Sequence, residues 1–145
     1  MTHSALGAPP GTVRHAAMLV GLQGAIGVIG AVVFLIRGLA GADRHIVNGY
    51  GNALWFGIFG GVLLLAGWAM WTGRRWGRGI GIYAQMLLLP VSWYAGVGSG
   101  QWGYAIPVAL VSVAVLVLLF SPATIQWLTG GADSAKADRS GPDKR

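Results

Sequence analysis

Four long apolar stretches, separated by short polar connections, dominate the hydropathy pattern of the chain. The stretches cover about residues 16–36, 50–71, 80–97 and 104–120. Each approaches the roughly 20 apolar residues that cross a hydrocarbon core of ~30 Å. The pattern predicts an all-α fold, in which residues 16–127 form one membrane domain, a bundle of four transmembrane helices in an up-down-up-down order.

The segments on either side lack this pattern. Residues 1–15 contain Gly, Pro and Ser without periodicity, which predicts a flexible tail. After Trp127 the composition becomes polar, and residues 128–145 cannot bury enough apolar surface to become ordered. A disordered C-terminal tail is therefore expected.

The first apolar stretch has an alternative interpretation. The triplet at residues 40–42, Ala-Gly-Ala, resembles the cleavage site of a secretory signal, and cleavage there would create a new N-terminus after Ala42. A signal core usually has about 7–15 apolar residues, and this run is longer. Arg37 also interrupts the run before the triplet, so a retained transmembrane helix is favoured.

Composition assigns the chain to the membrane class. It has 145 residues, 54% of them hydrophobic and 10% charged, which is too little polar surface for a water-exposed globule. The chain contains no cysteine, which excludes disulfides, thiolate metal sites, iron–sulfur ligation and thiol nucleophiles.

The distribution of Lys and Arg predicts the orientation. Eight of them fall in the N-terminal tail, the connection between the second and third stretches, and the C-terminal tail, whereas only Arg37 and Arg44 lie on the other side. The positive-inside rule then places both termini in the cytoplasm, with the protein in the cytoplasmic membrane. Arg74, Arg75 and Arg78 determine this topology and are expected to contact anionic lipid headgroups.

Three polar side chains are predicted at the same depth in the bilayer. Gln23 and Gln85 lie about 7 and 5 residues into helices of the same direction, and Ser112 reaches a similar depth on a helix of opposite direction. These three are candidates for an intramembrane polar contact, either a hydrogen bond between helices or a contact to a ligand or ion. Pro90 is expected to kink the third helix, and whether Pro90 and Gln85 line a cavity stays open.

Small residues recur at helical spacing. They predict close helix packing, either within the bundle or against a second subunit. The candidate packing residues are Gly21, Gly24, Gly27, Gly30, Gly57, Gly61, Ala105 and Ala109.

The four stretches contain no Asp, Glu, Lys, Arg or His, which argues against the ionisable relays of pumps and coupled transporters. The histidines lie in tails or connections, so no cofactor or metal ligand set is predicted. Asp43 beside His45 is a weak acid–base or metal pair. Met18, Met70 and Met86 lack the spacing of copper ligands and are expected to fill gaps in the packing. An enzyme is not expected.

The motif GRRWGRG at residues 73–79 is followed by Gln85, LLLP at 87–90 and later LFSP at 119–122. With this set the chain resembles a group of small bacterial four-span membrane proteins to which no activity is assigned. In size and layout it is also similar to small multidrug transporters and fluoride channels. The transporters carry a membrane glutamate where this chain offers only Gln23, and the polar Thr/Ser/Phe track of the channels is absent.

Two functions are consistent with these features. The first is a non-catalytic accessory or assembly component that packs against other membrane subunits, or against further copies of itself, through its Gly and Ala faces. The alternative is a small channel or facilitator for a neutral or anionic solute, with a path lined by Gln and Ser. Neither needs a nucleic acid, and neither identifies the partner or substrate.

Overall fold

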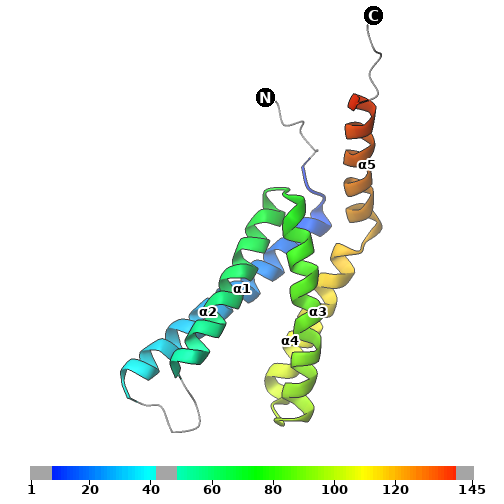
Figure 1. Ribbon diagram of the computed structural model, residues 1–145. Helices are drawn as coiled ribbons and strands as arrows, with labels where there is room; N and C mark the ends of the chain where they lie inside the picture. Colours follow the sequence, from blue (N-terminus) through cyan, green and yellow to red (C-terminus); the bar gives the residue numbers. More distant parts are fainter. Residues whose placement is uncertain (1–7, 42–48, 140–145) are drawn as a thin grey trace, which may run out of the picture.

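The computed structural model of the protein describes residues 8–41 and 49–139 (Figure 1). Within these two ranges the chain forms α-helices and no strands. The helices are α1 (Gly11–Leu39), α2 (Gly49–Trp71), α3 (Arg75–Val97), α4 (Trp102–Leu119) and α5 (Pro122–Arg139). The all-α bundle predicted from the hydropathy pattern is confirmed. His3, Asp43, Arg44 and His45 lie outside the described residues.

Helices α1 to α4 are each long and apolar enough to cross a membrane. The shortest, α4, has 18 residues, which at ~1.5 Å per residue span about 27 Å, close to the thickness of the hydrocarbon core. Their observed bounds lie within about three residues of the four predicted stretches, except that α1 and α3 each begin about five residues earlier than predicted. The chain therefore has the architecture of a multi-pass membrane protein.

Helix α1 begins at Gly11, inside the segment expected to be a flexible tail. The carbonyl of Pro10 accepts hydrogen bonds from the backbone N–H of Val13 at 3.0 Å and of Arg14 at 3.2 Å. Val13 is buried in the core, and the Thr12 hydroxyl lies 3.1 Å from that of Thr124. These contacts to distant segments order the first turn, and hydropathy along the chain cannot detect them.

Helix α5 also differs from expectation, because residues 128–139 continue a helix where a disordered tail is predicted. Pro122 occupies the first helical position, and the Ser121 hydroxyl accepts a hydrogen bond from the Thr124 N–H at 3.4 Å. Lys136 and Arg139 lie in the last turn, where cations interact favourably with the helix dipole. Local helix signals therefore favour a helix in this segment. Residues 140–145 lie outside the described residues.

Helices α1 and α2 form a tight antiparallel hairpin. A Cβ atom on Gly24 would lie 2.5 Å from the backbone nitrogen of Leu64, and one on Gly60 would lie 2.7 Å from that of Val28. No real Cβ fits at such distances, so glycine is what allows the two backbones to touch. Helices α3 and α4 form the second hairpin, in which Gly96 lies against the ring of Trp102.

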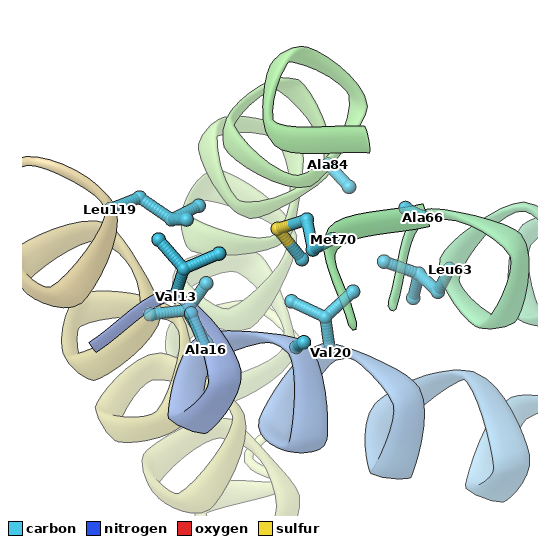
Figure 2. Packing of buried hydrophobic residues seen from close by; sticks show 10 residues of the cluster. Val13, Ala16, Val20, Leu63, Ala66, Met70, Ala84 and Leu119 are labelled. Atoms are coloured by element: carbon cyan, nitrogen blue, oxygen red, sulfur yellow. The ribbon is translucent and has the colours of Figure 1, made fainter. Parts of the chain in front are cut away.

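The apolar core lies where the two hairpins meet (Figure 2). Figure 2 shows Met70 of α2 between Val13 and Val20 of α1, with Leu119 and Ala84 on neighbouring sides. The core draws on the N-terminal half of α1 and the C-terminal parts of α2 and α4. These segments all lie at the end of the bundle that carries the α2–α3 turn, which we term the closed end.

From the closed end the hairpins diverge (Figure 1). Helices α1 and α2 run together to the far end of the first hairpin, and α3 and α4 run together to the turn at residues 98–101, well apart from it. We term this side of the bundle the open end. The bundle is thus a wedge of two hairpins joined at one end, and α5 extends away from the closed end.

Candidate functional site

The space between the diverging hairpins is a cleft of about 570 Å³. Trp55 and Phe59 of α2 contribute to one wall, and Leu87 and Val91 of α3 to the opposite wall. Pro107, in the second turn of α4, lies in the wall as well. A volume of this size is typical of binding sites for small ligands, which occupy about 300–1,000 Å³.

The walls of the cleft are apolar and partly aromatic. The rings of Trp55 and Phe59 lie 4.4 Å apart, and the ring of Phe56, which also lines the cleft, stacks on Phe34 at 5.5 Å. These side chains are held by ring contacts within the first hairpin. The cleft therefore keeps one wall of large, ordered side chains.

Gln23 is the polar side chain in the lining of the cleft. Its carboxamide faces that of Gln85 across α1 and α3, and the two form reciprocal hydrogen bonds. Gln85 Nε2 donates to Gln23 Oε1 at 2.7 Å, and Gln23 Nε2 donates to Gln85 Oε1 at 3.4 Å. The pair joins the two hairpins just above the core, at the base of the cleft.

The two amides differ in environment. Gln85 is fully buried, whereas Gln23 is only partly buried and faces the cleft. Each carboxamide has two N–H donors and two acceptor lone pairs, and the reciprocal pair uses one of each. Gln23 therefore keeps an N–H and a lone pair at the cleft.

Ser112 is fully buried on α4, but it does not join this pair. Its hydroxyl oxygen has no hydrogen-bond partner among the described residues. The structure thus brings together two of the three side chains predicted at this depth. The third is a buried polar atom that packing places among the apolar side chains of α4, beside Val115.

The predicted packing residues divide into two groups. Gly24 and Gly27 contact α2 directly, Gly30 lies 3.7 Å from the Phe56 ring, and Gly57 lies 3.7 Å from Ala31, each measured from a Cβ on the glycine. A Cβ on Gly21 or Gly61 would meet nothing within 4 Å. The backbone of Gly21 nevertheless lies against Gly67. Gly61 is turned away from α1, because the neighbouring Gly60 occupies the contact face of α2.

Ala105 is buried and Ala109 half-buried, both on α4. Several packing glycines do not belong to the predicted set, among them Gly60, Gly67 and Gly77. A Cβ on Gly67 would lie 2.8 Å from the Gly21 nitrogen, and one on Gly77 would lie 2.7 Å from the Ala69 Cβ. Gly60 and Gly67 are seven residues apart, so a heptad spacing in α2 is the signal that could have identified their shared face.

Pro90 lies within α3, which stays helical from Arg75 to Val97. Its side chain is exposed and is not part of the cleft lining. Gln85 is buried and does not line the cleft either. Pro107 lines the cleft instead, together with Val108 and Val111 of α4.

The arginines expected at the headgroups lie at the closed end. Arg78 donates from Nε at 3.3 Å and from Nη2 at 3.1 Å to the carbonyl of Leu119, which ends α4. The guanidinium of Arg74 lies over the ring of Trp68, 4.7 Å from its centroid. Arg75 is exposed. One of the three arginines therefore acts as a helix cap, and the other two face outward.

Among the described residues, no group of three or more His, Cys, Asp or Glu lies close enough to hold a metal ion. Met70 packs in the core, and Met18 and Met86 are exposed on the bundle surface. Comparisons of the chain with protein-family profiles, with curated proteins and with solved structures give no match, so the interpretation rests on the geometry of the site.

Proposed function

We propose that the protein is a non-catalytic accessory or assembly component of a membrane complex, and that the cleft receives the apolar side chains on one face of a partner subunit's transmembrane helix. The observation that carries this proposal is the cleft itself. Four spans would bury more apolar surface as a closed bundle, yet here two tight hairpins stay apart toward the open end.

The chemistry of the walls favours a helix as occupant. In hydrocarbon the backbone groups of an occupant must be satisfied internally, which an α-helix achieves. Apolar side chains spaced along one helix face can fill a groove between two walls, as in helix-in-groove recognition. Aromatic side chains such as Trp55 and Phe59 are enriched in protein interfaces. Gln23 offers a donor and an acceptor to one polar side chain of such a helix.

The same geometry gives weaker support to a facilitator. In a path lined by Gln and Ser, the polar groups would have to face a common space. Gln23 and Gln85 instead bond to each other, and Ser112 does not line the cleft. One observation keeps this second proposal open, the unpartnered hydroxyl of Ser112. Solute flux into proteoliposomes should fall on Gln85→Leu if the protein is a facilitator, and unchanged flux would remove this function.

We also propose that the closed end faces the cytoplasm, in the cytoplasmic membrane. Arg14, the α2–α3 turn and α5 with its two basic residues all lie at this end. The bias of Lys and Arg in short connections supports this orientation. Because the chain has no native cysteine, the single-cysteine variants Arg75→Cys and Ser99→Cys can each be tested with a membrane-impermeant thiol reagent applied to one side of the membrane. Labelling of Arg75→Cys from outside would contradict the proposed orientation.

The main test uses tagged protein purified in mild detergent from its native membrane. An integral membrane protein should copurify at a fixed ratio. The variant Leu87→Trp fills the cleft and should lose the copurifying protein. The control Met86→Trp changes the adjacent exposed position outside the lining and should retain that protein. A lone monomer, or equal recovery with both variants, would contradict the proposal.

A further inference from the structure

Two arginines at the closed end are stacked on two neighbouring tryptophans of α2. The guanidinium carbon of Arg14 lies 4.6 Å from the centroid of the Trp71 ring, and that of Arg74 lies 4.7 Å from the centroid of the Trp68 ring. Residues three apart in a helix are surface neighbours, with Cβ atoms about 5–6 Å apart. The two guanidinium groups therefore lie over adjacent rings, one reaching α2 from the start of α1 and the other from the α2–α3 turn.

This arrangement is fixed by the fold at several points. The backbone N–H of Arg74 donates to the Ala69 carbonyl at 2.7 Å, and Gly73 makes the turn with a φ of +76°, which favours glycine. Arg14 lies in the first turns of α1, and its neighbours Val13 and Ala16 are buried in the core. The separation of the two guanidinium groups is thus set by the helix packing of the closed end.

The two positive charges have no carboxylate partner in the described part of the chain, where no ion pair to Arg14 or Arg74 is formed. The whole sequence contains only four acidic residues, Asp43, Asp133, Asp138 and Asp143. None of them lies in α1 to α4. Among the described side chains nothing neutralises this pair, so both charges are open to an anion from outside the chain.

Both tryptophans lie in the last turns of α2 and are about half exposed, Trp68 at 50% and Trp71 at 44%. Tryptophan prefers the headgroup level of the bilayer, and both guanidinium groups are therefore held at this depth. Arginine binds phosphate through planar, paired N–H donors. The N-terminus of α3 begins beside Arg74, without a side-chain cap and without an acidic residue in its first turn, and adds positive potential.

We infer that Arg14 and Arg74, positioned by Trp71 and Trp68, form a binding site for the phosphodiester headgroup of one anionic phospholipid. The site is separate from the cleft and does not depend on a partner subunit. It binds the lipid from the leaflet that meets the closed end of the bundle, whichever side of the membrane this is.

The experiment titrates the full-length protein in neutral detergent with phosphatidylglycerol and counts retained lipids by native mass spectrometry. The wild type should retain one phosphatidylglycerol more tightly than phosphatidylcholine. Removing both charges in Arg14→Gln/Arg74→Gln should weaken this binding by about tenfold or more. The matched control Arg75→Gln/Arg139→Gln loses the same formal charge at two exposed positions and should bind as the wild type does.

The Trp68→Leu/Trp71→Leu variant separates position from charge. It keeps both arginines but removes the rings that hold them, so it should lose the preference for phosphatidylglycerol while the net charge is unchanged. Equal weakening in the two double-arginine variants would show that diffuse charge attracts the lipid and would overturn the site. Displacement of the lipid by inorganic phosphate at constant ionic strength would overturn it too, because the ligand would then be free phosphate.

Discussion

The carboxamides of Gln23 and Gln85 bond to each other across α1 and α3, with Gln85 Nε2 2.7 Å from Gln23 Oε1. This contact marks the level at which the two hairpins separate. On one side of it lies the apolar core around Met70, and on the other side lies the cleft. The pair thus links the hairpins without closing the space between them.

The two glutamines should respond unequally to substitution. Gln23→Leu leaves the fully buried Gln85 amide without its partner, which should cost about 1–3 kcal/mol of stability. Gln85→Leu should cost less, because Gln23 faces the cleft. The double variant should recover to within about 1 kcal/mol of the wild type, since such bonds contribute only about 0.6 kcal/mol on average. Reversible unfolding in mixed micelles measures all three, and additive losses would contradict the pairing.

Gly60 and Gly61 offer a matched pair of adjacent positions in α2. Alanine at Gly60 would place its Cβ 2.7 Å from the Val28 nitrogen and force α1 and α2 apart, which should cost about 1–3 kcal/mol. Alanine at Gly61 meets open space and should stabilise the helix by up to about 1 kcal/mol through its higher propensity. Thermal unfolding in detergent compares them. If Gly61→Ala destabilised the protein, this face of α2 would be in contact with another molecule, such as a second subunit.

Arg78 should matter for the junction between α4 and α5. Arg78→Gln removes the two hydrogen bonds to the Leu119 carbonyl and the contact to the Phe120 ring. Because the side chain is half-buried, the loss should be about 1.5 kcal/mol, the lower limit for hydrogen bonds to charged groups. Arg75→Gln, which is exposed, should change stability by less than about 0.5 kcal/mol. Equal effects in unfolding experiments would show that Arg78 does not cap α4.

Substitution of Ser112 should not destabilise the protein, unlike substitution of a buried polar residue that is hydrogen-bonded. Its buried hydroxyl has no partner, and such a group costs about 1–3 kcal/mol to desolvate. Ser112→Ala should therefore leave stability unchanged or raise it. Unfolding of the purified protein measures this, and a clear loss of stability would mean that the hydroxyl is bonded to a water or a solute in the membrane.

The sequence alone predicts most of the fold, because each span is a local property. Run length and the lack of charge predict α2 and α4 within about two residues, whereas α3 begins earlier, at Arg75 in the arginine-rich connection. The depth of a residue follows from counting along its helix, which is how Gln23 and Gln85 are placed at one level. The early start of α1 depends on contacts to distant segments such as Thr124, and these leave no trace in local hydropathy.

The cleft and the arginine pair are properties of helix packing, which the pattern of residues did not reveal. A glycine every third residue in α1 shows that a close contact exists but not which residue of α2 it meets, so Gly61 was favoured over Gly60. The angle between the hairpins follows from side chains packed at the closed end. Phe59 and Val91 lie in two separate apolar runs of the sequence, and only the helix packing places both in the lining of one cleft.

Photo-crosslinking in native membranes tests most directly whether the cleft holds a helix of a partner protein. A photoreactive residue at Phe59, in the cleft wall, is compared with one at Ile58, its exposed neighbour outside the lining. The account predicts a discrete adduct with a transmembrane segment of another integral membrane protein at Phe59, and lipid adducts alone at Ile58. Lipid adducts alone at both positions would contradict it.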